Sequence, residues 1–75
     1  VSILNILIMA KIQLNGRKIE LKNKYSISTM LKKYKIDSKK IAVELNGKII
    51  NRTKYNLIYL KNKDKIEIVQ FIGGG

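Results

Sequence analysis

The chain has 75 residues and a formal net charge of +11, from 16 Lys and Arg against five Asp and Glu. This length suits one small domain, which buries only about 60% of the surface that its unfolded chain exposes. The chain has no Cys and no His, which excludes disulfides, thiolate metal sites and the commonest general base. We therefore expect no metal site and no cofactor bound by this chain.

The first eight residues, VSILNILI, are mostly apolar. They are far too short to span a bilayer, which takes about 20 residues, and they have no basic region of the kind that begins a signal peptide. We expect Met9 to be the natural start, residues 1–8 to be an upstream extension and the protein to avoid membranes. The alternative is that residues 1–8 lengthen the first strand.

A β-hairpin is predicted immediately after Met9. Ile12 and Leu14 share one face of a strand, and Ile19 and Leu21 share one face of the next. Between them stands Asn15-Gly16, and Asn-Gly between alternating runs is a strong signal for a type I′ turn, because both central residues need positive φ. Residues 11–14 and 17–21 should pair antiparallel.

The period then changes from two to that of a helix. Ile27, Met30, Leu31 and Tyr34 fall at i, i+3, i+4 and i+7, which places them on one helical face. Ser26 stands before them as the expected N-cap. We predict a helix of about nine residues that ends near residue 35, with residues 37–38 in the following loop.

The second half repeats the hairpin pattern. A strand over 41–45 turns at Asn46-Gly47 into a short strand over 48–50, and a last strand runs over 65–72 after a polar turn at 61–64. This last strand should carry Ile66 and Ile68 on one face and Val69 and Phe71 on the other. Between the strands, residues 51–61 should form a helical turn and a loop that cover the sheet, and we expect three of them to pack inward, namely Leu57, Ile58 and Tyr59.

This order of elements predicts an α+β domain over residues 9–72, with a mixed sheet packed on one main helix. The first and last strands can lie side by side at the centre of the sheet, which is the ubiquitin-like β-grasp arrangement. Glu44 and Glu67 should occupy the outer faces of their strands. The five acidic residues include no close pair suited to acid–base chemistry, and the serines and threonines have no His to activate them. We expect no intrinsic catalysis.

The chain has only five glycines, and three of them, Gly73, Gly74 and Gly75, follow the last predicted strand. Three extended residues reach about 10 Å, and the absence of side chains suits insertion into a narrow channel of another protein. The α-carboxylate of Gly75 has an ordinary pKa of about 3.3–3.7 and is ionised at neutral pH. We expect residues 73–75 to form a flexible tail that presents this carboxylate, and the alternative is a frayed terminus.

Several stretches together resemble the ThiS family of sulfur-carrier proteins. They are MAKIQLNG, SISTMLKKY, IAVELNGKIINRTKY and KDKIEIVQFIGGG, which span residues 9–75. The chain departs from that family in its Asn51, where Pro is frequent, in its Lys63, where Gly is frequent, and in its high positive charge. Asn62 can supply the left-handed turn residue in place of that Gly.

The resemblance implies a function in thiamin thiazole synthesis. The Gly75 carboxylate would be adenylated by a ThiF-type adenylyltransferase that supplies the ATP and Mg²⁺, and then converted to a thiocarboxylate with sulfur from a cysteine desulfurase. The acceptor of the sulfur would be a ThiG-type thiazole synthase. We expect Phe71 and Ile72, just before the glycines, as docking anchors, although Phe71 is an equal candidate for the core.

Other functions remain open at this point. The same fold and tail suit a MoaD-type carrier for molybdopterin synthesis, a carrier for tRNA thiolation or a modifier attached to lysines. MoaD-type chains tend to carry a proline before the glycines, and this chain has none. We expect a monomer in the cytoplasm, or in the plastid stroma if the chain is plastid-encoded.

The positive charge also suits a small RNA-binding domain, with Lys32, Lys33, Lys39 and Lys40 on phosphates. We favour another origin for the charge, because 14 Lys, 14 Ile and seven Asn make up 35 of the 75 residues and all three have A/T-rich codons. Only two of the 16 basic residues are Arg, which suits phosphate better than Lys does. We therefore do not expect nucleic acid as a partner.

Overall fold

Two Asn-Gly hairpins form most of the sheet in the computed structural model, which describes residues 10–71. β1 (Ala10–Leu14) pairs antiparallel with β2 (Arg17–Leu21), and β3 (Ile41–Leu45) pairs antiparallel with β4 (Lys48–Ile50). Both turns have positive φ at their two central residues, 50° and 81° at Asn15 and Gly16 and 52° and 86° at Asn46 and Gly47. The predicted hairpins are therefore confirmed, together with the reason for their turns.

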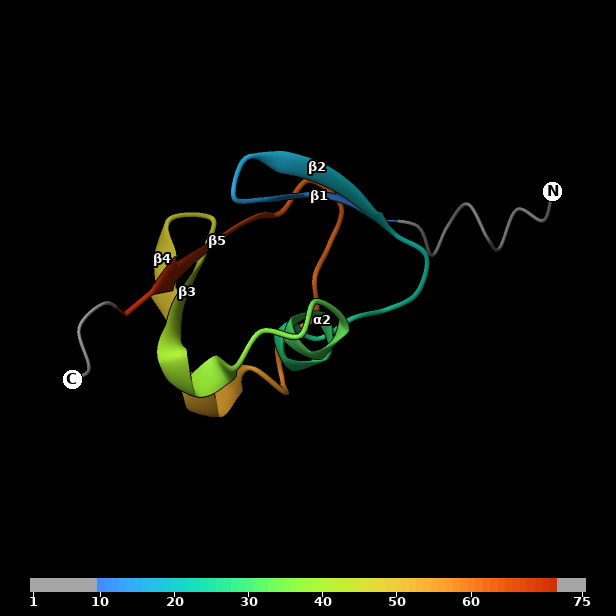
Figure 1. The fold of residues 1–75 in the computed structure, drawn as a ribbon. Coiled ribbons are helices and arrows are strands. Elements are labelled where there is room, and N and C mark those ends of the chain that lie inside the picture. Colours follow the sequence, from blue (N-terminus) through green and yellow to red (C-terminus); the bar gives the residue numbers. More distant parts are fainter. Residues whose placement is uncertain (1–9, 72–75) are drawn as a thin grey trace, which may run out of the picture.

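The last strand, β5 (Lys65–Gln70), joins the two hairpins into one sheet of order β2-β1-β5-β3-β4. It runs parallel to β1 and antiparallel to β3. The sheet curves around the one α-helix of the described chain, α2 (Ile27–Lys33), as Figure 1 shows. This is the predicted β-grasp arrangement, with the first and last strands side by side at the centre.

The core lies between α2 and the inner face of the sheet. The strands contribute alternate residues, and the helix contributes Ile27, Met30 and Leu31, all of them buried. The predicted N-cap is confirmed, because the Ser26 hydroxyl accepts a hydrogen bond from the Thr29 backbone N at 3.0 Å. Two 3₁₀ turns, η1 (Ser38–Lys40) and η2 (Arg52–Lys54), begin after the side-chain caps Asp37 and Asn51.

The prediction that Tyr34 belongs to the buried helical face is wrong. The helix ends at Lys33, Tyr34 is its C-cap, and the Tyr34 side chain is 38% exposed. Lys35 takes a left-handed conformation with φ 57°, and the Ile36 N–H bonds back to the Leu31 carbonyl at 2.9 Å. This is a Schellman ending, and Ile36 packs against the core in the place that the periodicity had given to Tyr34.

The prediction that Leu57 and Tyr59 pack inward is also wrong, because they are 72% and 53% exposed. Residues 58–60 run extended beside residues 25–27, held by the Ile27 N–H on the Ile58 carbonyl and the Leu60 N–H on the Tyr25 carbonyl. Extended backbone alternates its side chains. Ile58 and Leu60 therefore turn toward the core, as predicted for Ile58, and Tyr59 turns outward.

Candidate functional site

The end of β5 is where the predicted tail leaves the fold. Ile66 is buried and Ile68 is half-buried on the inner face, while Val69 lies on the outer face opposite Ala42 of β3. The strand ends at Gln70, and the Phe71 backbone N still donates to the Lys40 carbonyl at 3.0 Å. The backbone is thus fixed as far as Phe71, through a bond to the residue that precedes β3.

Phe71 is 64% exposed, so of the two roles left open for it the structure favours the surface anchor over the core. By alternation its side chain lies on the outer face with Val69. The other proposed anchor, Ile72, and the tail residues Gly73, Gly74 and Gly75 lie outside the described residues, as do residues 1–8.

Val69 and Phe71 belong to a larger apolar surface on the outer face. Val69 is 54% exposed, and Ile49 of β4 is 76% exposed on the same face. We call this surface the docking patch; it consists of Ala42, Ile49, Val69 and Phe71. The surface position of Ile49 was not predicted from the sequence, although its alternation with Ile50 indicates it. Exposed apolar groups gathered in this way mark a site of protein contact.

Two carboxylates lie next to the docking patch. Glu44 of β3 and Glu67 of β5 lie on the outer face, as predicted. They are also directly opposite each other, which was not predicted, and Glu44 faces Ile49 of β4. Like charges at directly opposed positions of a sheet are destabilising.

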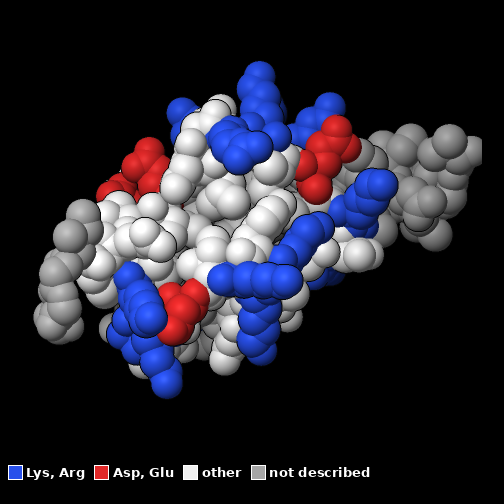
Figure 2. Space-filling view, in the orientation of Figure 1, with Lys and Arg blue, Asp and Glu red and all other residues white. Residues whose placement is uncertain are grey.

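Basic residues predominate elsewhere on the surface. Figure 2 shows blue Lys and Arg side chains spread over the face, whereas red Asp and Glu side chains occur at a few places.

The side chains of the two Asn-Gly turns fix β5 in place. The Asn15 Oδ1 accepts from the Ile68 backbone N at 2.6 Å, and the Asn46 Oδ1 accepts from the Lys65 backbone N at 2.8 Å. These bonds come from both sides of the strand. They hold β5 in a defined register, so that the docking patch and the C-terminal end of β5 keep a fixed position relative to each other.

Two of the five acidic side chains, those of Asp37 and Asp64, accept hydrogen bonds within the described fold. Asp37 accepts from the Lys39 backbone N, and Asp64 accepts from the Lys61 backbone N and from the Asn46 side chain. Residues 10–71 contain no group of three or more His, Cys, Asp or Glu that could hold a metal ion. Within the same residues, no helix is long and apolar enough to cross a membrane.

Comparisons with known proteins agree with this geometry. A model of the ThiS family matches residues 7–75. The sulfur carrier protein ThiS of Bacillus subtilis (strain 168) is 38% identical over 65 residues, which cover 85% of this chain and 98% of that protein. The uncharacterized protein ycf40 of Pyropia yezoensis is 33% identical over 64 residues, which cover 85% of this chain and 90% of that protein.

A larger protein matches over part of its length. The thiazole synthase of Paramagnetospirillum magneticum is 35% identical over 65 residues, which cover 87% of this chain and 20% of that protein. Among solved structures, the crystal structure of ThiS from Geobacter metallireducens superimposes with a TM-score of 0.76 and 25% sequence identity. That match covers 87% of this chain and 99% of the Geobacter chain.

Proposed function

The chain belongs to the ThiS family, and on that premise we propose how its residues carry sulfur. It is a sulfur carrier protein of thiamin thiazole synthesis and acts as a cosubstrate, not as an enzyme. The proposed reactive group is the α-carboxylate of Gly75, at the end of the three glycines. The observation that supports this most is the exposed C-terminal end of β5, where Phe71 lies at the surface within the docking patch.

The first proposed step activates the carboxylate. A carboxylate oxygen of Gly75 attacks the α-phosphorus of ATP, pyrophosphate leaves, and an acyl-adenylate remains on the carrier. A ThiF-type adenylyltransferase supplies the ATP, the Mg²⁺ and a site that excludes water. The carrier contributes a tail without side chains, which enters such a site with little steric hindrance.

The second proposed step exchanges oxygen for sulfur. The terminal sulfur of a persulfide on a cysteine desulfurase attacks the acyl carbon, and AMP leaves. A thiol then cleaves the sulfur–sulfur bond, which leaves a thiocarboxylate on Gly75. The carrier has no Cys, so no side chain of its own competes for the sulfur as a persulfide.

Membership of the family implies thiazole synthase as a partner. The match to one part of the thiazole synthase of Paramagnetospirillum magneticum supports this pairing. The adenylyltransferase and the desulfurase are proposals that rest on the chemistry that the carboxylate needs. For location, we propose the cytoplasm or a plastid stroma, and the similarity to ycf40 of Pyropia yezoensis supports the plastid.

Deletion of Gly74 and Gly75 tests the role of the tail. The shortened chain should fold as the parent does, because the deletion leaves the five strands, α2 and the buried core of residues 10–71 intact. It should fail to support ATP–pyrophosphate exchange by the adenylyltransferase. Circular dichroism and exchange of labelled pyrophosphate are the two measurements, and undiminished exchange would show that the tail is not the reacting element.

A further inference from the structure

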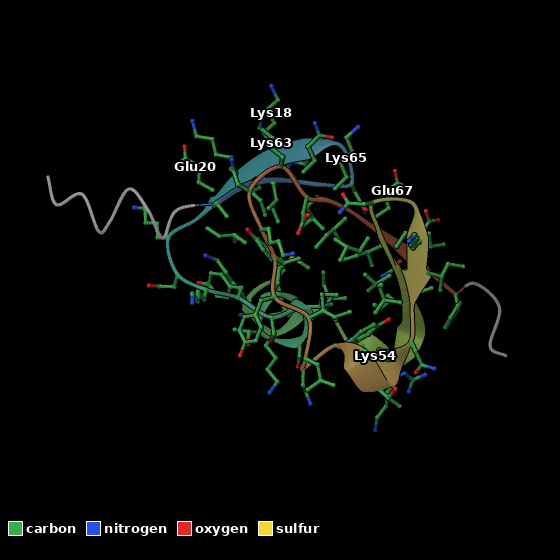
Figure 3. The ribbon with its side chains drawn as sticks, turned by 180° about the vertical axis from the view of Figure 1, so that it is seen from behind. Lys18, Glu20, Lys54, Lys63, Lys65 and Glu67 are labelled. Atoms are coloured by element: carbon green, nitrogen blue, oxygen red, sulfur yellow. The ribbon has the colours of Figure 1, made fainter. Side chains whose placement is uncertain are left out.

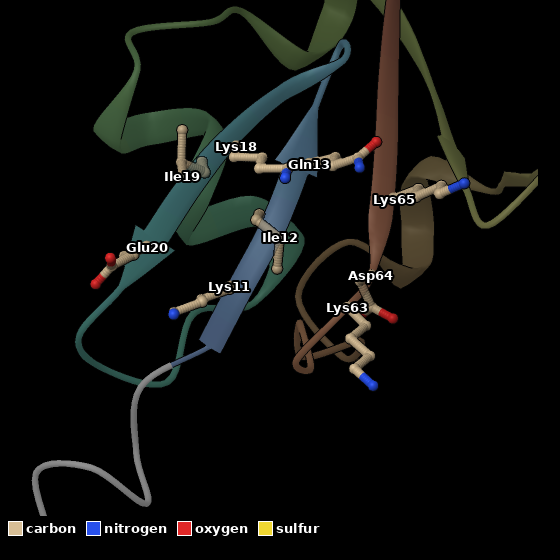
Figure 4. Close-up of a pocket in the computed structure, with 9 residues that line it drawn as sticks. All are labelled: Lys11, Ile12, Gln13, Lys18, Ile19, Glu20, Lys63, Asp64 and Lys65. Atoms are coloured by element: carbon tan, nitrogen blue, oxygen red, sulfur yellow. The ribbon is translucent and has the colours of Figure 1, made fainter.

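A basic cleft lies on the outer face of the sheet, at the opposite end of β5 from the tail. It has a volume of about 510 Å³ and is formed by β1, β2, the turn at 61–64 and the first residue of β5. Four lysines line it, and Figure 4 shows them around the strands: Lys11, Lys18, Lys63 and Lys65. In Figure 3, Lys18, Lys63 and Lys65 lie together at this end of the fold, whereas Lys54 lies near η2 at the other end.

The turn that carries Lys63 is fixed along the edge of β1. The Lys63 backbone N donates to the Lys11 carbonyl at 2.7 Å, and the Lys11 backbone N donates to the Asn62 side chain at 2.9 Å. The Gln13 backbone N donates to the Asp64 carbonyl at 2.9 Å. The base of the Lys63 side chain therefore has a defined position at the cleft.

Lys63 has an unfavourable backbone conformation at this position. Its φ is 72°, in the left-handed region that glycine and asparagine adopt most readily. The prediction that Asn62 supplies the left-handed residue of this turn is therefore wrong, because Lys63 itself takes that conformation. Such a conformation in a residue with a long side chain is a reason to ask what that side chain does. Here the side chain adds an ammonium group to a cleft that already has three.

The two carboxylates at the cleft do not balance these lysines. The cleft is lined by four lysines and by only two carboxylates, Glu20 and Asp64, so the carboxylates offset half of the positive charge. Glu20 stands opposite Lys11 in the β1–β2 pair. The cleft therefore presents an excess of positive charge to solvent.

The chemistry of the cleft suits a broad acidic surface better than a small anion. A small phosphate site needs donors in a fixed arrangement, typically Arg or a series of backbone N–H groups, and lysines on flexible stems do not provide one. The cleft also shares the outer face with the docking patch. Lys65 and Phe71 are six steps apart along β5 and its extension, a distance of about 20 Å. A protein interface of about 800 Å² per partner can span this distance.

We propose that this cleft docks an acidic surface of the adenylating partner, outside the active site of that enzyme, and speeds the encounter of the two proteins. The inference rests on the proposed function and adds a second point of contact to it. The docking patch and tail form the contact near the reaction, and the cleft provides electrostatic steering, which acts on association rates and weakens with salt.

Two glycine substitutions test the proposal as a matched pair. Lys63→Gly and Lys35→Gly each remove one positive charge and each relieve a left-handed lysine, with φ 72° and 57° respectively. Only Lys63 lines the cleft. Both variants should have thermal midpoints equal to or above that of the parent, so a loss of folding does not confuse the result.

The measurement is kcat/KM of the adenylyltransferase for each carrier at low and at high salt. Lys63→Gly should lower kcat/KM about fivefold at low salt, and this difference should become small at high salt. Lys35→Gly should keep a kcat/KM close to that of the parent. Equal values for the two variants at low salt would overturn the proposal. So would titrations in which the carrier alone binds ATP or RNA in a Lys63-dependent way, because the cleft would then serve another ligand. Deletion of Gly74 and Gly75 abolishes the reaction whatever the cleft does, so the two proposals fail separately.

Discussion

The side chain of Asn15 satisfies both backbone hydrogen-bonding groups of Ile68. Its Oδ1 accepts from the Ile68 N at 2.6 Å, and its Nδ2 donates to the Ile68 carbonyl at 3.3 Å. The parallel β1–β5 ladder pairs Gln13 with Lys65 and Leu14 with Ile66. The Asn15 amide thus takes over from the backbone where β1 ends, and it extends the support of β5 toward the tail.

Replacement of Asn15 by glycine separates this contact from the turn. Asn15→Gly keeps a residue that adopts positive φ easily but removes both bonds to Ile68. The free energy of unfolding should fall by about 1–2 kcal/mol, and the Ile68 amide should exchange its hydrogen faster. Urea unfolding and amide hydrogen exchange measure the two effects. Asn23→Gly, in the exposed loop after β2, is the control. An equal loss of unfolding free energy in both variants would refute the role of the Asn15–Ile68 hydrogen bonds.

The opposed pair Glu44 and Glu67 predicts a stabilising substitution. Glu67→Gln removes one of two like charges at directly opposed positions, so the free energy of unfolding should rise by about 0.2–1 kcal/mol at neutral pH. The control is Glu20→Gln, because Glu20 faces Lys11 across β1 and β2 and its loss removes an attraction. Both variants change the net charge equally. A lower urea midpoint for Glu67→Gln than for the parent would contradict this account of the pair.

The docking patch predicts a loss of binding without a loss of stability. Phe71→Ala removes a side chain that is 64% exposed, so the thermal midpoint should change little. The affinity of the Phe71→Ala carrier for the adenylyltransferase should fall about tenfold, because aromatic anchors contribute much of the binding energy of an interface.

Leu57→Ala provides the comparison for Phe71→Ala. Leu57 is also apolar and exposed, but it lies in the segment after η2, away from the outer face of the sheet. The affinity of the Leu57→Ala carrier for the adenylyltransferase, measured by titration calorimetry, should match that of the parent. If the two variants bind equally well, the patch is not the docking surface.

Much of the fold could be predicted from local patterns. The alternation of Ile41, Val43 and Leu45 and the two Asn-Gly turns determine the hairpins, because register follows from turn type and from which face is buried. The same alternation predicted that Val69 and Phe71 share the face opposite Ile66 and Ile68, but it left Phe71 open between the core and the surface. The strand that leads to the predicted site could therefore be predicted from the sequence as far as Phe71.

The predictions that failed depended on one local left-handed turn and on contacts between distant segments. Nothing in the spacing of Tyr34 shows that Lys35 takes a left-handed conformation and sends Ile36 into the core instead. Tyr59 is exposed because residues 58–60 run extended beside residues 25–27, which is a tertiary relationship. The basic cleft was missed for the same reason, since two of its lysines come from the β1–β2 hairpin and two from residues 63–65, far away along the chain.

The most direct test of the account is the intact mass of the carrier after incubation with the adenylyltransferase, a cysteine desulfurase, ATP and cysteine. The account predicts a gain equal to the replacement of one oxygen by one sulfur. Fragmentation should place the gain on Gly75, and the variant without Gly74 and Gly75 should show none. An unchanged mass with active enzymes, or sulfur found on any other residue, would contradict the claim that the main-chain carboxylate carries the sulfur.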